Sequence, residues 1–190
     1  MNNRENLEFN NKKICGLWLI LVGAVIGVSL IFGGHFIINP IIFLIGYYVC
    51  FFISNFNKKI RAKLSQGKMS GFQKKMIFFS IMSLFFLMSI FSGRYFATWN
   101  WRMIWLGVMI ATAIHFCTFY FVHGKSMIFL GLACAAIALV GYNLPADKTW
   151  ISFAADAITK ATFGAYLLFF SKPTVSKKTI LVNRKSPANA

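Results

Sequence analysis

Two ionisable residues of opposite charge lie inside an apolar stretch near the C-terminal end of the chain. Asp156 and Lys160 are four residues apart within the stretch from Trp150 to Phe170. Residues with this spacing share one face of a helix, so the two side chains can form an ion pair. Ionised groups in an apolar helix often mark a substrate or proton pathway. The alternative is a salt bridge that only orients the helix, with Lys160 extending toward the membrane surface.

A second set of polar residues lies in the apolar stretch from Met103 to Val122. Thr112 and His115 are three residues apart and share a helical face. Imidazole titrates near a pH of about 6.5, so His115 beside Asp156 would relay protons. The alternative is a histidine that hydrogen-bonds to a neighbouring helix, and the sequence does not show whether the two stretches touch. The predicted intramembrane polar core consists of Asp156, Lys160, His115, Thr112 and Thr159.

Residues 94–102, between two apolar stretches, are rich in tryptophan and arginine. Aromatic residues at this position are typical of the belt that membrane proteins form at the lipid–water interface. The density of arginine and tryptophan also fits a site for an anionic headgroup or a peptide. The candidate outer ligand or partner site consists of Arg94, Trp99, Asn100, Trp101 and Arg102.

The turn His123-Gly124-Lys125 joins two apolar stretches and holds a histidine at their end. A lipid-modifying enzyme needs a base or nucleophile at such an interface, but the chain carries no HExxH, GxSxG or paired acidic motif. Gly124-Lys125-Ser126 resembles the end of a P-loop, yet Phe119 stands where its first glycine is required. The four cysteines form no CxxC pair. The sequence therefore predicts no catalytic residue, no metal site and no cofactor.

The composition indicates that these residues are positioned by membrane-spanning helices. The chain is 58% hydrophobic and 13% charged, whereas soluble domains are about 45–50% apolar and about 25% charged. Six apolar stretches approach the roughly 20 residues that a helix needs to cross a bilayer. They are Ile14–Phe32, Ile38–Phe56, Met76–Phe91, Met103–Val122, Met127–Leu144 and Trp150–Phe170. We predict an all-α, polytopic six-helix transmembrane bundle of three consecutive helical hairpins.

Local signals predict several helix ends. Asn39 followed by Pro40 is typical of an N-cap with proline at the first helical position. Gly124 after His123 predicts a glycine C-cap, and Ser126 predicts the N-cap of the following helix.

Small residues predict close contacts between helices. Gly23 and Gly27 form a GxxxG pair, with Gly16 seven residues earlier, and Gly131 and Gly107 begin similar patterns. Such residues let helix backbones approach each other in a membrane, either within the bundle or at a homo-oligomer interface.

The basic residues predict the orientation of the chain. It carries a net charge of +16, and sixteen of its twenty lysines and arginines fall on one side of the predicted spans, against three on the other. Under the positive-inside rule both termini are then cytoplasmic. This explains the charge without a nucleic-acid partner. The predicted parts are a cytoplasmic arm (1–13), a transmembrane domain (14–170) with a basic cytoplasmic loop (57–75) that attracts anionic headgroups, and a basic cytoplasmic tail (171–190).

Four motifs resemble those of an uncharacterised family, a domain of unknown function in small bacterial multi-span membrane proteins. They are Gly16-Leu17-Trp18-Leu19-Ile20, Asn39-Pro40-Ile41-Ile42-Phe43, Asn100-Trp101-Arg102-Met103-Ile104-Trp105-Leu106-Gly107 and Val122-His123-Gly124-Lys125-Ser126-Met127. The resemblance implies a helical bundle in a bacterial plasma membrane. It implies no activity and no catalytic residues.

Three classes of function remain open. The first is a small transporter-like or accessory membrane protein that uses the polar core. The second is a non-catalytic partner-binding or immunity-type subunit, which would bind a membrane protein partner or a second copy through its outer loop and glycine faces. The third is a lipid-modifying membrane enzyme that would depend on His123.

Overall fold

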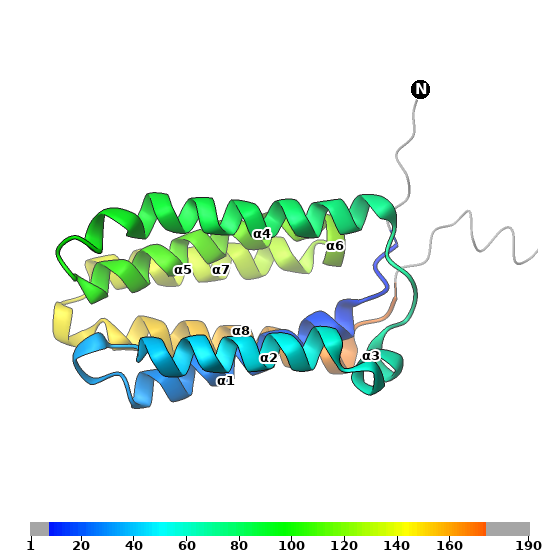
Figure 1. Ribbon diagram of the computed structural model, residues 1–190, viewed down its shortest axis with the longest axis horizontal. Helices are drawn as coiled ribbons and strands as arrows, with labels where there is room; N and C mark the ends of the chain where they lie inside the picture. Colours follow the sequence, from blue (N-terminus) through cyan, green and yellow to red (C-terminus); the bar gives the residue numbers. More distant parts are fainter. Residues whose placement is uncertain (1–7, 174–190) are drawn as a thin grey trace, which may run out of the picture.

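The computed structural model describes residues 8–173, which are all-α and form two layers of long helices (Figure 1). The long helices are α1 (Lys12–Ile31), α2 (Pro40–Phe56), α4 (Gly71–Ser92), α5 (Trp101–Thr118), α7 (Ser126–Asn143) and α8 (Trp150–Phe170). The short helices are α3 (Lys58–Leu64) and α6 (Tyr120–His123), and three 3₁₀ turns cover Gly34–Phe36, Gly93–Tyr95 and Ala146–Lys148.

Each of the six predicted apolar stretches is helical, but not all of the predicted ends are correct. Asn39 caps α2 as predicted, because its Oδ1 accepts hydrogen bonds from the backbone N–H of Ile41 and of Ile42. The predicted Ser126 cap is wrong: Lys125 occupies the N-cap position of α7, and no side chain caps that helix.

The segment predicted as a long basic loop (57–75) is partly helical. It contains α3, and α4 already begins at Gly71 because Ser70 and Gln73 form a reciprocal capping box. Within residues 8–173, five helices are long and apolar enough to cross a membrane by length and composition. The number becomes six when α2 is counted together with α3, from which it is bent by 63°.

The long helices run as three successive hairpins (Figure 1). Their connections (residues 32–39, 93–100 and 144–149) lie together at one end of the bundle, here called the turn end. Both ends of the described chain, α3 and the α5–α7 connection lie at the opposite end, here called the basic end. Helices α1, α2 and α8 form one layer and α4, α5 and α7 form the other, and contacts between α7 and α8 join the two layers.

The contact between α1 and α8 is the most extensive helix contact among the described residues and runs through glycines. A Cβ atom on Gly16 would lie 2.6 Å from the carbonyl oxygen of Gly164, and one on Gly23 would lie 2.7 Å from that of Ala157. The predicted packing role is confirmed for Gly16 and Gly23. Gly27 has no atom within 4 Å of its Cβ position and makes no helix contact within the bundle, so its role at a homo-oligomer interface stays a prediction. The GxxxG pattern therefore contributes only one of its two glycines to the contact.

In α4 the distribution of side chains is the inverse of that in a helix of a soluble protein. Helix α4 exposes a surface of phenylalanines, such as Phe78 and Phe86, which are 66% and 67% exposed. The residues it buries are all polar: Gln73, Ser80 and Ser92. Exposed apolar surface over buried small polar residues is the arrangement of helices that pack within lipid.

We expect Gly16→Ala to destabilise the protein, because its methyl group would lie 2.6 Å from a backbone oxygen of α8. Gly27→Ala, in the same helix, meets nothing within 4 Å. It should leave stability unchanged or raise it by up to about 1 kcal/mol, since alanine is a better helix former than glycine. Thermal unfolding of both purified variants in detergent measures the difference. Equal melting temperatures would contradict the assigned helix contact.

Candidate functional site

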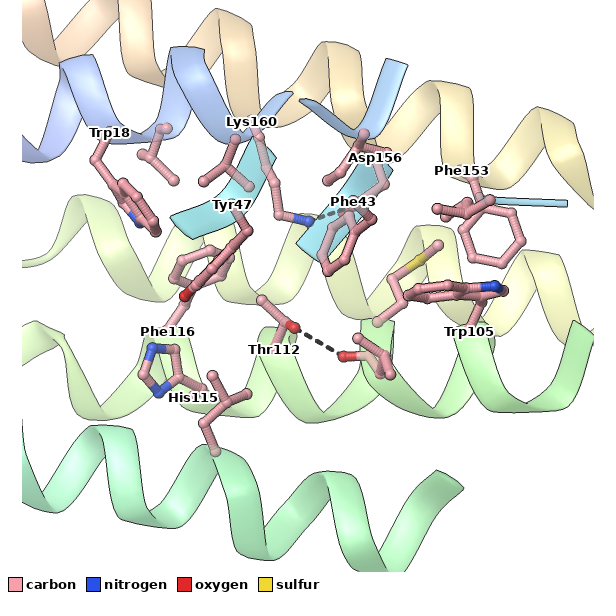
Figure 2. A pocket seen from close by; sticks show the side chains of 17 residues that line it. Trp18, Phe43, Tyr47, Trp105, Thr112, His115, Phe116, Phe153, Asp156 and Lys160 are labelled. Atoms are coloured by element: carbon pink, nitrogen blue, oxygen red, sulfur yellow. Dashed lines mark hydrogen bonds and ion pairs between the residues drawn. The ribbon is translucent and has the colours of Figure 1, made fainter. Parts of the chain in front are cut away.

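A cavity of about 90 Å³ lies between the two helix layers (Figure 2). Its walls come from α1, α2, α4, α5 and α8. Four of the five residues of the predicted polar core line it: Asp156, Lys160, His115 and Thr112. The fifth, Thr159, is not among its lining residues. The structure thus brings the polar groups of α5 and α8 to one cavity, which the sequence alone did not establish.

Asp156 and Lys160 form a buried ion pair on one wall of the cavity, from adjacent turns of α8 (Figure 2). The lysine Nζ donates to Oδ2 of the carboxylate. The other carboxylate oxygen, Oδ1, is buried and has no partner at ordinary hydrogen-bond geometry among the described residues. The Cys134 thiol of α7 lies near this carboxylate and is a weak donor. A carboxylate can accept several hydrogen bonds, so the cavity is lined by a charged group whose bonding capacity is only partly used.

His115 lies on the opposite wall, on α5, and is tied to α4. Its Nδ1 lies 2.8 Å from the carbonyl oxygen of Ser80 and 3.0 Å from the Ser80 hydroxyl. The Thr118 hydroxyl donates to the His115 carbonyl at 2.7 Å and is also hydrogen-bonded to Ser80. Because a carbonyl oxygen only accepts, Nδ1 carries the proton, and Nε2 of the neutral ring is left as an acceptor. The hydrogen bond to a neighbouring helix, one of the two predicted alternatives, is therefore present.

Aromatic side chains form much of the remaining wall (Figure 2). Trp105 lies edge-on to Phe43, with ring centroids 5.3 Å apart, and its Nε1 donates to the carbonyl oxygen of Phe36 at 3.0 Å. Trp18 packs edge-on against Tyr47 at 5.0 Å. Sequence reasoning missed these residues as cavity-lining groups. In a chain with 22 phenylalanines, nothing in the sequence separates inward-facing rings from those that face outward.

Two residues of the candidate outer site stabilise helix ends. The Asn100 side chain accepts a hydrogen bond from the backbone N–H of Met103 and so caps α5. The Arg102 guanidinium donates to carbonyl oxygens where α7 ends, those of Gly141, Tyr142 and Leu144. These contacts join α5 to α7 at the turn end. The Arg102 guanidinium is therefore hydrogen-bonded within the protein.

The other three residues of that candidate site are spread over the turn end. Trp101 packs edge-on against Phe36, with ring centroids 4.9 Å apart. The Arg94 guanidinium lies over the ring of Tyr95, 4.6 Å from its centroid. Trp99 is exposed and has a positive φ of 49°. Only Arg94 and Trp99 present exposed side chains with a charge or a large ring.

The third predicted group, His123, Gly124 and Lys125, forms the connection between α6 and α7 at the basic end. His123 is buried and stacks on Phe119 with ring centroids 5.6 Å apart. Burial, with a smaller effect of the nearby Lys12, lowers the pKa of His123 to about 4. The imidazole is therefore neutral at pH 7, and its Nδ1 has no hydrogen-bond partner among the described residues. Gly124 has a φ of 89°, a conformation that favours glycine, and Lys125 is exposed.

Within residues 8–173, no group of three or more His, Cys, Asp or Glu side chains is placed to hold a metal ion. A family model described as a family of unknown function, DUF6609, matches residues 2–177. No curated protein and no solved structure matches the chain.

We expect Asp156→Asn to destabilise the protein by about 3–5 kcal/mol, because it leaves the buried Lys160 without its counter-ion. The double variant Asp156→Asn/Lys160→Gln removes both charges together and should unfold close to the unmodified protein. Thermal unfolding in detergent, followed by size-exclusion chromatography, tests this. A double variant as unstable as the single one would show that the pair is not an isolated ion pair.

Proposed function

The chain belongs to the DUF6609 family of unknown function, and we propose that it is a transporter-like membrane protein with six spans and a hydrated polar cavity. The observation that carries the proposal is the Asp156–Lys160 pair, which lines the cavity and leaves one carboxylate oxygen without a partner at ordinary hydrogen-bond geometry among the described residues. An uncompensated charge in a membrane costs at least about 2.5–3.5 kcal/mol on insertion scales. A purely structural pair would be expected to satisfy its hydrogen bonds within the protein.

The cavity has room for the water that such a pair requires. A single buried water needs roughly 10–15 Å³, whereas the cavity measures about 90 Å³. Water there can donate to Oδ1 of Asp156 on one wall and to Nε2 of His115 on the other, with Thr112 between the two (Figure 2). A chain of such waters, lying between the two helix layers, would carry protons or a small solute. Transporters of other folds place their sites at this depth, between packed bundles.

The division of charge between the two ends supports a cytoplasmic location for the basic end. Within residues 8–173, the turn end carries Arg94, Arg102 and Lys148, whereas eleven bases belong to segments at the basic end. Positive charge in short loops resists translocation. Both termini would then be cytoplasmic, in a plasma membrane, and the proposed organism is a bacterium, as the sequence motifs imply.

Helix α3 supports the same orientation. It turns by 63° from α2, directly after the apolar surface of that helix ends. Its four basic side chains are exposed: Lys58, Lys59, Arg61 and Lys63. Its apolar residues Ile60 and Leu64, one turn apart, are half-buried. A short helix of this kind suits the membrane surface, where each base near anionic headgroups contributes about 1 kcal/mol.

The orientation is tested with single cysteines in a variant that lacks the four native ones. We expect an impermeant maleimide to label Thr98→Cys, at the turn end, on intact cells. Lys68→Cys, at the basic end, should be labelled only after lysis, because its segment lies in the cytoplasm. Labelling of Lys68→Cys on intact cells would place the basic end outside and contradict the proposed topology.

The hydrated cavity is tested with silver ions, which react with thiols that water reaches. We expect Thr112→Cys, in the cavity wall, to be blocked by silver in the folded protein within a bilayer. Ile158→Cys, 66% exposed on the outer surface of the same bundle, should stay unreacted because lipid covers it. Alkylation after denaturation counts the free thiols. Protection of both positions would identify Asp156 and Lys160 as a dry structural pair and contradict the proposed function.

A further inference from the structure

We infer that the cavity binds a small monovalent cation, which competes with Lys160 for the carboxylate of Asp156 and displaces one proton from the lysine. The inference rests on the proposed function, because it names the class of ligand that the hydrated cavity takes.

The cavity wall favours positive charge. Its only carboxylate, that of Asp156, has one oxygen without a partner at ordinary hydrogen-bond geometry in the described part of the chain. Six aromatic side chains line the same cavity: Trp18, Phe43, Tyr47, Trp105, Phe116 and Phe153. Ring faces attract cations and repel anions. The Lys160 ammonium already uses both features, since it pairs with Asp156 and lies 5.9 Å from the centre of the Phe116 ring.

The size of the cavity excludes large bound molecules. Its wall also offers too few oxygen ligands for a divalent metal ion. Drug-sized molecules occupy about 300–1,000 Å³, whereas this cavity measures about 90 Å³. Calcium requires about six to eight oxygen ligands and magnesium a near-ideal octahedron. One carboxylate and a few waters suit a sodium or potassium ion or a methylammonium ion.

Charge balance then requires the release of a proton. The Asp156–Lys160 pair is neutral as a whole, so an added cation would leave a net positive charge in a buried site. Neutrality returns when one N–H bond of the lysine breaks, its electron pair stays on Nζ, and the proton leaves through cavity water. Lysine suits this exchange because its protonation responds readily to burial. The carboxylate then pairs with the incoming ion, and one proton leaves for each cation bound.

The test measures proton release from the purified full-length protein in weakly buffered detergent solution. Sodium, potassium or methylammonium chloride is added, and a pH indicator follows the solution. N-methyl-D-glucamine chloride, whose cation is too large for the cavity, serves as the ionic-strength control. At least one of the three small cations should release about one proton per protein, and the control should release less than a tenth of that amount.

Variants assign the two roles. Asp156→Asn should release no proton. If this variant folds poorly, the neutral double variant Asp156→Asn/Lys160→Gln takes its place and should likewise release none. Lys160→Arg keeps the positive charge, but its guanidinium does not give up a proton. Addition of the cation to this variant should therefore release less than a tenth of the protons. Thr159→Val, on the same helix and outside the cavity wall, should behave as the unmodified protein.

Two results would overturn the inference. If no small cation exceeds the control while silver still reaches Thr112→Cys, the cavity is hydrated but not a cation site, and the proposed function stands without the inference. If Lys160→Arg releases as many protons as the unmodified protein, the proton comes from another group and the exchange mechanism is wrong. If silver also fails to reach the cavity, both proposals fail together.

Discussion

The backbone contact between α1 and α8 determines which side of α8 faces the inside of the bundle. Gly16 and Gly23 let α1 approach the backbone of α8 at Gly164 and Ala157, with no room for a side chain at the contact. With that face of α8 fixed against α1, the adjacent face, with Phe153, Asp156 and Lys160, lines the cavity. The position of the ion pair therefore depends on glycines that have no chemistry of their own.

The second layer meets this charged face with polar groups of its own. Helix α5 contributes Thr112 and His115, and α4 orients the histidine ring through Ser80. The two layers are joined mainly through α7 and α8. Helix α2 packs chiefly on α1. Its aromatic rings also make contacts across the cavity, such as that of Phe43 with Trp105. Such an arrangement leaves a cavity between the layers. The buried ionisable side chains Asp156, Lys160 and His115 line it, and large apolar side chains cover much of the outside of the bundle.

The sequence predicted the helices and their polar residues well, for physical reasons. Long apolar runs have only one stable form in lipid, and the Asn39 cap depends on local bonds alone. Long-range features were harder to predict. Gly27 has the same spacing signal as Gly23, but no atom of another helix lies within 4 Å of its Cβ position. The partner of His115, Ser80, lies 35 residues away and is one of many serines in an apolar helix. The inward-facing aromatic rings depend on the rotation of each helix, which composition does not encode.

The central claim is that the carboxylate of Asp156 faces a cavity that water enters. The chain contains only two aspartates, Asp147 and Asp156, so a variant Asp147→Asn labelled with ¹³C-carboxyl aspartate reports on Asp156 alone by infrared spectroscopy. In lipid nanodiscs we expect the band of an ionised carboxylate that shifts promptly when H₂O is exchanged for D₂O. A band that does not move while the protein stays folded would show that Asp156 is sealed from water, and would contradict the account.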